Sequence, residues 1–179
     1  WDQMNTYLKR SFLARMGLGP LIRWQLHTLR QWDQLSSSRV DYLLANSNFT
    51  ARRIKKFWRR HSEVLHPPVN VDRFKWNKPR EDFYLSVCRL VPNKRVDLVV
   101  RAFNKLKLPL VVVGDGVEKA YLKEIAGPTV QILGFQNQDK IEKLMSKCRA
   151  FVYAGVEDFG IAPVEAMASG APVIAFGKG

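Results

Sequence analysis

Short apolar runs alternate with single helical segments through the second half of the chain, and this pattern constrains the fold more than any other feature. Five runs rich in Val, Ile and Leu predict strands over residues 83–88, 110–113, 130–133, 150–153 and 172–176. The segments between them predict helices over about 94–106, 117–126, 137–147 and 161–169. This alternation is typical of an α/β fold with a Rossmann-like, doubly wound parallel sheet. Such sheets bind ligands outside the carboxyl ends of their strands.

The first part of the chain has a different composition. Residues 1–76 contain 14 Lys and Arg against 5 Asp and Glu, together with all five tryptophans, whereas residues 77–179 contain 15 against 11. Helical spacing and apolar runs in the first part predict helices over 3–16, 20–36 and 49–60 and a short strand over 40–45. Prolines at positions 67, 68 and 79 interrupt regular structure near the change in composition. We therefore predict a domain boundary there. Because the chain opens on Trp1 and stops just after an apolar run, we expect a fragment of a longer protein.

Two of the turns that follow predicted strands carry candidate binding groups. Arg89 and Lys94 follow the first strand of the regular region; a guanidinium offers a planar fork to phosphate oxygens, and an ammonium offers a point charge. The turn Gly114-Asp115-Gly116 follows the next strand, and its glycines let the backbone lie close to a ligand. Each turn taken alone also fits a simpler interpretation, a pair of solvated cations or a plain strand-to-helix turn.

A third turn, from Gly155 to Gly170, contains two glutamates eight positions apart, Glu157 and Glu165. A helix that starts near Ile161 would present free N–H groups and the positive end of its dipole to a phosphate. Carboxylates repel phosphates, so hydroxyl groups are the natural partners of the two glutamates. Exposed, solvated carboxylates are the alternative. Because the three turns fall at one edge of the predicted sheet, their cations and carboxylates together fit the two ends of a nucleotide sugar.

The same residues resemble a known family. The segment from Glu157 to Ala175 looks like the two-glutamate signature of family-4 (group 1) retaining glycosyltransferases of the GT-B fold. The segment from Ser86 to Lys94 is similar to the Arg/Lys turn that holds the donor phosphate in that family. Residues 45–51 and 66–74 resemble the stretch that joins its two domains. The resemblance runs from about residue 40 to residue 179, and it is closest to mannosyltransferases of surface-polysaccharide assembly.

The resemblance implies two Rossmann-like domains with an active site in the cleft between them. Residues 1–76 would then be the tail of the N-terminal, acceptor-binding domain with the interdomain linker. Residues 77–179 would be a nucleotide-sugar-binding C-terminal domain, cut before its last elements. The family places a histidine of the catalytic site in the N-terminal domain, and none of the three histidines here has a matching context. A chain of this extent could bind the donor and be inactive alone.

The resemblance also implies roles for individual residues. Arg89 and Lys94 would bind the donor diphosphate and neutralise the departing nucleoside diphosphate, Glu157 would contact the donor sugar, and Glu165 would bind the ribose hydroxyls. Further donor-binding positions would be Gly114, Asp115, Gly116, Asp158, Phe159, Gly160 and Ile161. The implied reaction transfers a sugar, mannose by the closest likeness, from a nucleoside diphosphate sugar such as GDP-mannose or a UDP-sugar to an acceptor hydroxyl with retention. No cofactor is expected, and because the chain contains no Asp-x-Asp, a metal-bridged diphosphate is not indicated.

The resemblance also implies an acceptor glycan or lipid-linked glycan. The basic, Trp-containing region 1–60 leads us to expect peripheral membrane contact, in the cytoplasm at the inner face of the membrane. Cys88 and Cys148 fit buried, reduced thiols. The net charge of +13 and six cations within 52–60 raise the alternative of a nucleic-acid-binding module, but no recognisable motif supports such a partner. A glycoside hydrolase that uses Glu157 and Glu165 is the other alternative, although hydrolysis does not require the accompanying cations.

Overall fold

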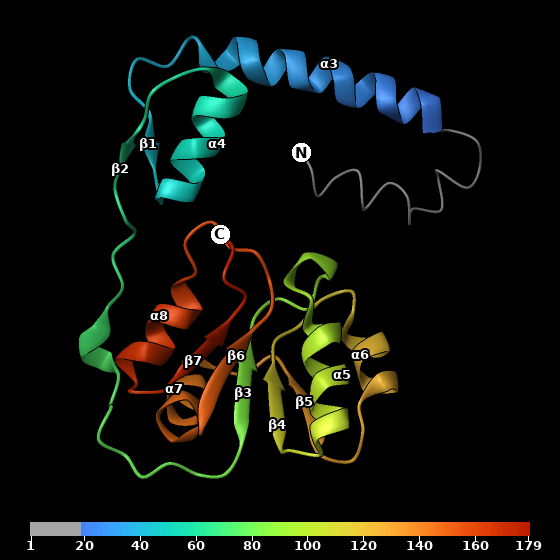
Figure 1. Cartoon of the computed structure of the whole chain (residues 1–179), viewed down its shortest axis with the longest axis vertical. Coiled ribbons are helices and arrows are strands. Elements are labelled where there is room, and N and C mark those ends of the chain that lie inside the picture. The colour runs from blue at the N-terminus through green and yellow to red at the C-terminus, as the bar shows by residue number, and fades with distance from the viewer. Residues whose placement is uncertain (1–18) are drawn as a thin grey trace. The chain divides into compact units, whose positions relative to one another are not determined.

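The computed structural model describes residues 19–179, and the predicted helix over 3–16 lies outside them. The contacts of the chain divide it into two compact units, Trp1–His66 (unit 1) and Pro67–Gly179 (unit 2) (Figure 1). Residues 67–76 belong to unit 2 by their contacts, because Phe74 is buried in its core. The assignment of these units to acceptor and donor domains stays a prediction.

The described part of unit 1, residues 19–66, contains two helices and a small parallel ribbon. Its elements are α3 (Gly19–Ser37), β1 (Leu44–Ala45), α4 (Asn48–Trp58) and β2 (Glu63–Val64), with β1 and β2 paired in parallel. Ser47 caps α4 by accepting a hydrogen bond from the Thr50 backbone N–H at 3.1 Å, as expected for a serine at this position. The two helices are linked by the Trp58 indole, which donates to Asp33 Oδ2 at 3.0 Å. The predicted helices over 20–36 and 49–60 are thus confirmed within two residues.

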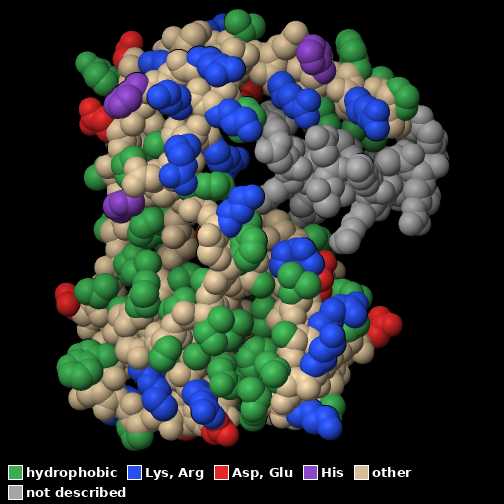
Figure 2. Space-filling model, viewed as in Figure 1, with side chains coloured by type: hydrophobic (Ala, Val, Ile, Leu, Met, Phe, Trp, Pro, Cys, Tyr) green, Lys and Arg blue, Asp and Glu red, His purple; other side chains and the backbone are tan. Residues whose placement is uncertain are grey.

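The predicted strand over 40–45 is much shorter in the structure. Only Leu44 and Ala45 are paired with another strand. The Arg60 guanidinium donates hydrogen bonds to the carbonyl oxygens of Ser37, Val40 and Asp41, so the backbone just before the strand is held as a turn after α3. Arg60 therefore has a structural role, whereas the remaining cations of α4 and its C-cap lie on the exposed surface. Figure 2 shows Lys and Arg side chains gathered on this part of the molecule.

Unit 2 is built on a five-stranded parallel sheet in the order β5-β4-β3-β6-β7, which confirms the predicted parallel, Rossmann-like sheet. The strands are β3 (Tyr84–Val87), β4 (Leu110–Val113), β5 (Val130–Gly134), β6 (Ala150–Tyr153) and β7 (Val173–Ala175). The helices are α5 (Val96–Leu106), α6 (Lys119–Ile125), α7 (Gln138–Lys147) and α8 (Ile161–Ala168). After β3 the chain adds β4 and then β5 on one side of the sheet, and β6 then pairs with β3 on its other side. The topological switch point, where α/β sheets bind ligands, is therefore between β3 and β6.

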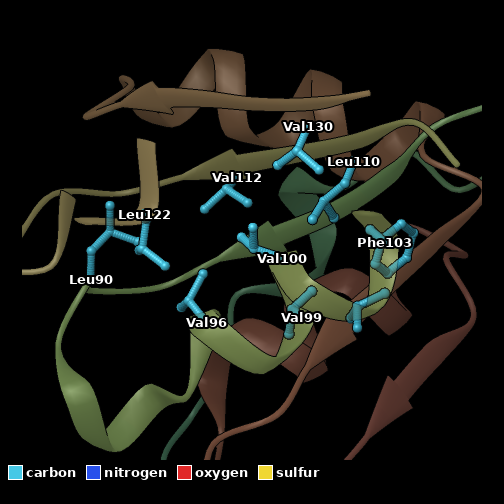
Figure 3. Packing of buried hydrophobic residues seen from close by; sticks show 10 residues of the cluster. Leu90, Val96, Val99, Val100, Phe103, Leu110, Val112, Leu122 and Val130 are labelled. Atoms are coloured by element: carbon cyan, nitrogen blue, oxygen red, sulfur yellow. The ribbon is translucent and has the colours of Figure 1, made fainter. Parts of the chain in front are cut away.

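Helices cover both faces of the sheet, and each face has its own apolar core. On one face, α5 and α6 pack on the strands through buried residues that include Val96, Val100 and Leu122 (Figure 3). On the other face, α7 and α8 pack over Leu85, Phe151 and their neighbours. Short Val- and Leu-rich strands are expected in a sheet whose two faces are both buried.

The Arg80 side chain bridges the carboxyl-terminal ends of α7 and α8 through hydrogen bonds. Its guanidinium donates to the Met145 and Ser169 carbonyl oxygens at 3.0 and 2.6 Å, so carbonyl groups that have no partner within their own helices are satisfied. These contacts link the carboxyl-terminal ends of the two helices that cover one face of the sheet. Within residues 19–179, no helix combines the length and apolar character needed to cross a membrane.

Candidate functional site

The loops after β3 and β6 meet at the carboxyl edge of the sheet, at the switch point. A Cβ atom added to Gly155 would lie 3.1 Å from Lys94 Cα and 3.2 Å from the Lys94 carbonyl oxygen, so the two loops touch backbone to backbone. Glycine at position 155 permits this approach, because a side chain would force the loops apart. Lys94 itself lies in a 3₁₀ turn, Pro92–Lys94, rather than in the helix predicted from residue 94. Arg95, with φ of 53°, separates this turn from α5.

Lys94, Glu157 and Tyr153 form a hydrogen-bonded cluster at this contact. The Lys94 ammonium pairs with Glu157 Oε1, and the Tyr153 hydroxyl donates to the same oxygen. The Lys94 Nζ atom also lies 5.9 Å from the centroid of the Tyr153 ring, within the range of a cation–π contact. Only 18% of the Lys94 side chain and 30% of the Glu157 side chain are exposed, so water screens this ion pair less than a surface pair. The structure thus brings together two of the residues that the sequence singled out.

Tyr153 is the member of the cluster that the sequence analysis missed. It ends β6, is 5% exposed and precedes Glu157 by four residues. Buried Tyr hydroxyls generally require a hydrogen-bond partner, and a Tyr at the end of a buried strand followed by a loop carboxylate was the available signal.

Burial sets the protonation of the groups around Glu157. The pKa of the Tyr153 phenol is raised above its ordinary value, first by burial and then by its hydrogen bond to Glu157. Burial also raises the pKa of the Cys88 thiol to about 12; nearby Lys94 lowers it and Glu157 raises it. Both groups therefore keep their protons at neutral pH, and Lys94 and Glu157 supply the charges of the cluster. Cys88 and Cys148 were predicted to be buried, reduced thiols; both are free in the structure, where Cys148 is buried and Cys88 is half-buried.

Arg89 lies in the same β3 loop, five residues before Lys94. Its side chain is exposed, and its guanidinium makes no ion pair or hydrogen bond with any residue in the described part of the chain. Arg89 can therefore bind an anion without first breaking a hydrogen bond or ion pair to another residue of 19–179. Its planar fork suits two phosphate oxygens at once.

Helix α8 begins directly after the Glu157 loop. Gly160 precedes it with φ of 87°, a conformation that favours glycine, and Pro163 falls in its first turn. No acidic residue lies in that turn, and its N-cap residue, Gly160, has no side chain that could cap it. The first N–H groups of the helix, including that of Ile161, have no partner within the helix and can face an anion. Asp158 and Phe159 lie between Glu157 and this helix start, with Asp158 exposed and Phe159 half-buried.

Glu165 has different surroundings from Glu157. It is half-buried on α8, and burial raises the pKa of its carboxyl group. Of the two charged neighbours that act on it, Arg73 opposes this rise and Glu142 reinforces it, and these two form an ion pair of 2.5 Å with each other. Glu157 lies in the loop before α8 and Glu165 lies on α8 itself, and the two have different charged neighbours.

The Gly114-Asp115-Gly116 turn shapes the Arg89 loop. A Cβ atom at Gly114 would lie 1.8 Å from the Cys88 carbonyl oxygen, and one at Gly116 would lie 2.3 Å from that of Leu90. The Asp115 carboxylate accepts hydrogen bonds from Lys119 Nζ at 2.7 Å and from the Gly116 N–H at 2.8 Å, and the bond from Lys119 is the main cause of its lowered pKa. Both glycines thus have a packing function, and their predicted contact with a ligand stays a prediction.

Residues 19–179 contain no group of three His, Cys, Asp or Glu side chains that could hold a metal ion. The carboxyl edge brings together charged side chains and one helix start. Cations and N–H groups lie beside a carboxylate, which is the combination that a phosphate joined to a polyhydroxylated group requires.

Comparisons with known proteins identify the family of the chain and its fold. Residues 69–179 match the family model for Glycosyl transferases group 1. The chain is 31% identical over 156 residues to the GDP-mannose-dependent alpha-mannosyltransferase of Mycolicibacterium smegmatis, with 80% of this chain and 41% of that protein covered. It is 38% identical over 126 residues to the N-acetylgalactosamine-N,N'-diacetylbacillosaminyl-diphospho-undecaprenol 4-alpha-N-acetylgalactosaminyltransferase of Campylobacter jejuni, with 63% of this chain and 34% of that protein covered.

A similar fold occurs in Anabaena Alr3699/HepE, solved in complex with UDP and glucose. The TM-score is 0.74 at 23% identity, with 85% of this chain and 49% of that chain covered. The chain thus spans between a third and a half of the length of these proteins. Because the family model covers more than half of the residues, the chain belongs to the group 1 glycosyl transferases.

Proposed function

We propose that this chain forms the donor-binding side of a retaining glycosyltransferase. In this proposal a sugar is transferred from a nucleoside diphosphate sugar to an acceptor hydroxyl with retention at the anomeric carbon. The observation that carries it is the position of the Lys94–Glu157 pair at the switch point of the sheet, next to the start of α8 and the exposed Arg89. Retention rests on the likeness of the two-glutamate segment to that of retaining enzymes.

The proposed reaction depends on stabilising the leaving diphosphate. Arg89 would bind two of its oxygens, Lys94 would exchange its contact with Glu157 for a third, and the N–H groups at the start of α8 would bind from the other side. Groups fixed in advance stabilise the negative charge that develops as the bond to the sugar breaks. This assignment gives the protein's own cations the role that a metal ion would otherwise have.

The two glutamates would bind hydroxyl groups. Once Lys94 contacts the diphosphate, Glu157 Oε1 and Oε2 can accept hydrogen bonds from the donor sugar. Glu165, about 6 Å further along α8 from Ile161, would accept them from the ribose. The raised pKa of Glu165 fits a carboxylate that gains stabilisation when hydroxyl donors reach it. The backbone around Gly114, Gly116 and Gly160 would border the ligand.

The donor and acceptor are proposed as classes. A relative named for GDP-mannose supports mannose as the sugar, and a relative named for N-acetylgalactosamine supports a wider set that includes UDP-sugars. That second relative's name contains a diphospho-undecaprenol, which supports a glycan or lipid-linked glycan as the acceptor.

We also propose that unit 1 contacts an anionic membrane surface at the cytoplasmic face. Lys55 and Lys56 lie three and four residues after Arg52 in α4, and Arg59 lies three residues after Lys56. The four cations therefore share one exposed face, on which no acidic residue lies. Trp24 and Trp32 of α3 are 65% and 66% exposed, and tryptophan is favoured at membrane interfaces.

Vesicle sedimentation tests this contact. Two cations contribute about 1 kcal/mol each at an anionic surface, so K55E/K56E should weaken binding to anionic vesicles at least roughly 30-fold. The matched control K140E/K143E makes the same charge change on α7 and should bind nearly as the unmodified protein does. Equal sedimentation with neutral and anionic vesicles would exclude the contact.

A calorimetric binding screen with GDP, UDP, ADP and their sugar forms tests the proposed function. We expect one nucleoside diphosphate and its sugar form to bind. Arg89→Ala should weaken the binding of both, because it removes a phosphate contact, and Glu165→Ala should do so through the ribose. Unchanged affinity in both variants would contradict the site assignment.

A further inference from the structure

We infer that Tyr153 is a positioning residue that holds the Glu157 carboxylate in place while Lys94 moves from Glu157 to a bound diphosphate. The inference rests on the proposed function, because it requires a ligand that attracts Lys94. It starts from one feature of the cluster: a single oxygen, Glu157 Oε1, is contacted by both the Lys94 ammonium and the Tyr153 hydroxyl.

The two partners of that oxygen differ in how firmly they are held. Tyr153 belongs to β6, and its ring is packed in the core between the sheet and the helices α7 and α8, stacked on Phe151 with 6.5 Å between ring centroids and 6° between ring planes. Its hydroxyl therefore has a fixed position. Lys94 lies in a 3₁₀ turn, and its ammonium is carried on a flexible four-carbon stem with three donors. Of the two contacts to Glu157 Oε1, the one made by Lys94 can therefore be exchanged for a contact with a ligand.

The charges explain why the second contact matters. When a diphosphate attracts Lys94, Glu157 loses its counterion while it is still only 30% exposed, and it then lies near a second negative group. An unpaired carboxylate in such a place would compete for Lys94 and oppose binding. A neutral hydroxyl donor compensates without adding a charge. Burial keeps the phenol protonated, so this donor is present throughout the neutral pH range.

Tyr153→Phe tests the inference because it keeps the ring and removes only the hydroxyl. Because the lost hydrogen bond is to a charged group, we expect the affinity for the nucleotide sugar to fall roughly 10- to 100-fold. Calorimetry with the nucleotide sugar identified in the binding screen measures this loss. Tyr84→Phe is the matched control: it makes the same change in β3 of the same sheet, on a ring that packs against Phe103, and should leave the affinity unchanged.

A double-mutant cycle separates positioning from a general structural effect. If Tyr153 acts through Glu157, Tyr153→Phe should cost little further affinity in a Glu157→Gln background. Equal losses in both backgrounds would mean that the hydroxyl acts on the fold in general, and no loss in either would mean that it does not act on binding; both results overturn the inference alone. Absence of nucleotide-sugar binding by the unmodified protein would overturn the proposed function and this inference with it.

Discussion

The two edges of the unit 2 sheet both carry ion pairs, but the pairs differ in their surroundings. At the amino edge, Arg149 pairs with Asp82 at 2.8 Å with 58% and 72% of the two side chains exposed, and Lys147 pairs with Glu81 at 2.7 Å with similar exposure. At the carboxyl edge, the Lys94–Glu157 pair is mostly buried and has a buried tyrosine as a third partner. Exposed pairs contribute little because water and salt screen them.

The difference supports the proposed binding role for the charges at the carboxyl edge. A partly buried pair costs desolvation energy, which the fold must offset through further hydrogen bonds such as that from Tyr153. The pair lies at the switch point, where a ligand can replace one of its members. At the amino edge, Arg149 lies 6.0 Å from the centroid of the Tyr84 ring, but within residues 19–179 no tyrosine hydroxyl donates to the carboxylates of the two pairs.

Replacing one lysine at each edge of the sheet tests this difference most directly. Lys94→Met keeps an unbranched apolar stem and removes the charge, so it should weaken nucleoside diphosphate binding roughly 100-fold through loss of a charge-assisted contact. Lys147→Met makes the same change at the amino edge and should alter the affinity less than about 2-fold. Calorimetry on both variants measures this, and similar losses in the two would remove the distinction between the edges.

A smaller effect is expected from the glycine between the two loops. Gly155→Ala would place a methyl group 3.1 Å from both Lys94 Cα and Tyr153 Cε1, so a shift of the loops should cost about 1–3 kcal/mol of unfolding free energy. Gly177→Ala is a control beyond β7, where nothing lies within 4 Å of an added Cβ, and it should change stability by less than about 0.5 kcal/mol. Denaturant unfolding of both variants checks this. An unchanged stability in Gly155→Ala would show that the loops are not in tight contact.

Much of the unit 2 fold could be predicted from the sequence because local signals agreed with it. The strands and helices fall within a few residues of their predicted bounds, since short Val-rich runs and helical spacing alternate without interruption. The strand order could not be obtained in this way. Only the structure shows that β6 returns beside β3 and so brings the Lys94 loop against the Glu157 loop, 63 residues further along the chain.

The candidate site was predictable in its residue types but not in its contacts. Arg89, Lys94 and Glu157 were identified from their positions after strands. The sequence assigned Lys94 and Glu157 to different parts of a ligand and gave no sign that they pair with each other. Gly114 and Gly116 were expected to border a ligand, whereas in the structure a Cβ at either would overlap a carbonyl oxygen of the Arg89 loop. Such contacts depend on three-dimensional packing, which a spacing pattern does not encode.

The central claim, that the carboxyl edge of the sheet binds the diphosphate of a sugar donor, is tested most directly by one calorimetric titration. The nucleoside diphosphate that binds the unmodified protein would be titrated into Arg89→Ala and Arg149→Ala, two exposed arginines at opposite edges of the same sheet. We predict that the dissociation constant rises roughly 10- to 100-fold for Arg89→Ala and less than about 2-fold for Arg149→Ala. Equal affinities for the two variants would contradict the claim.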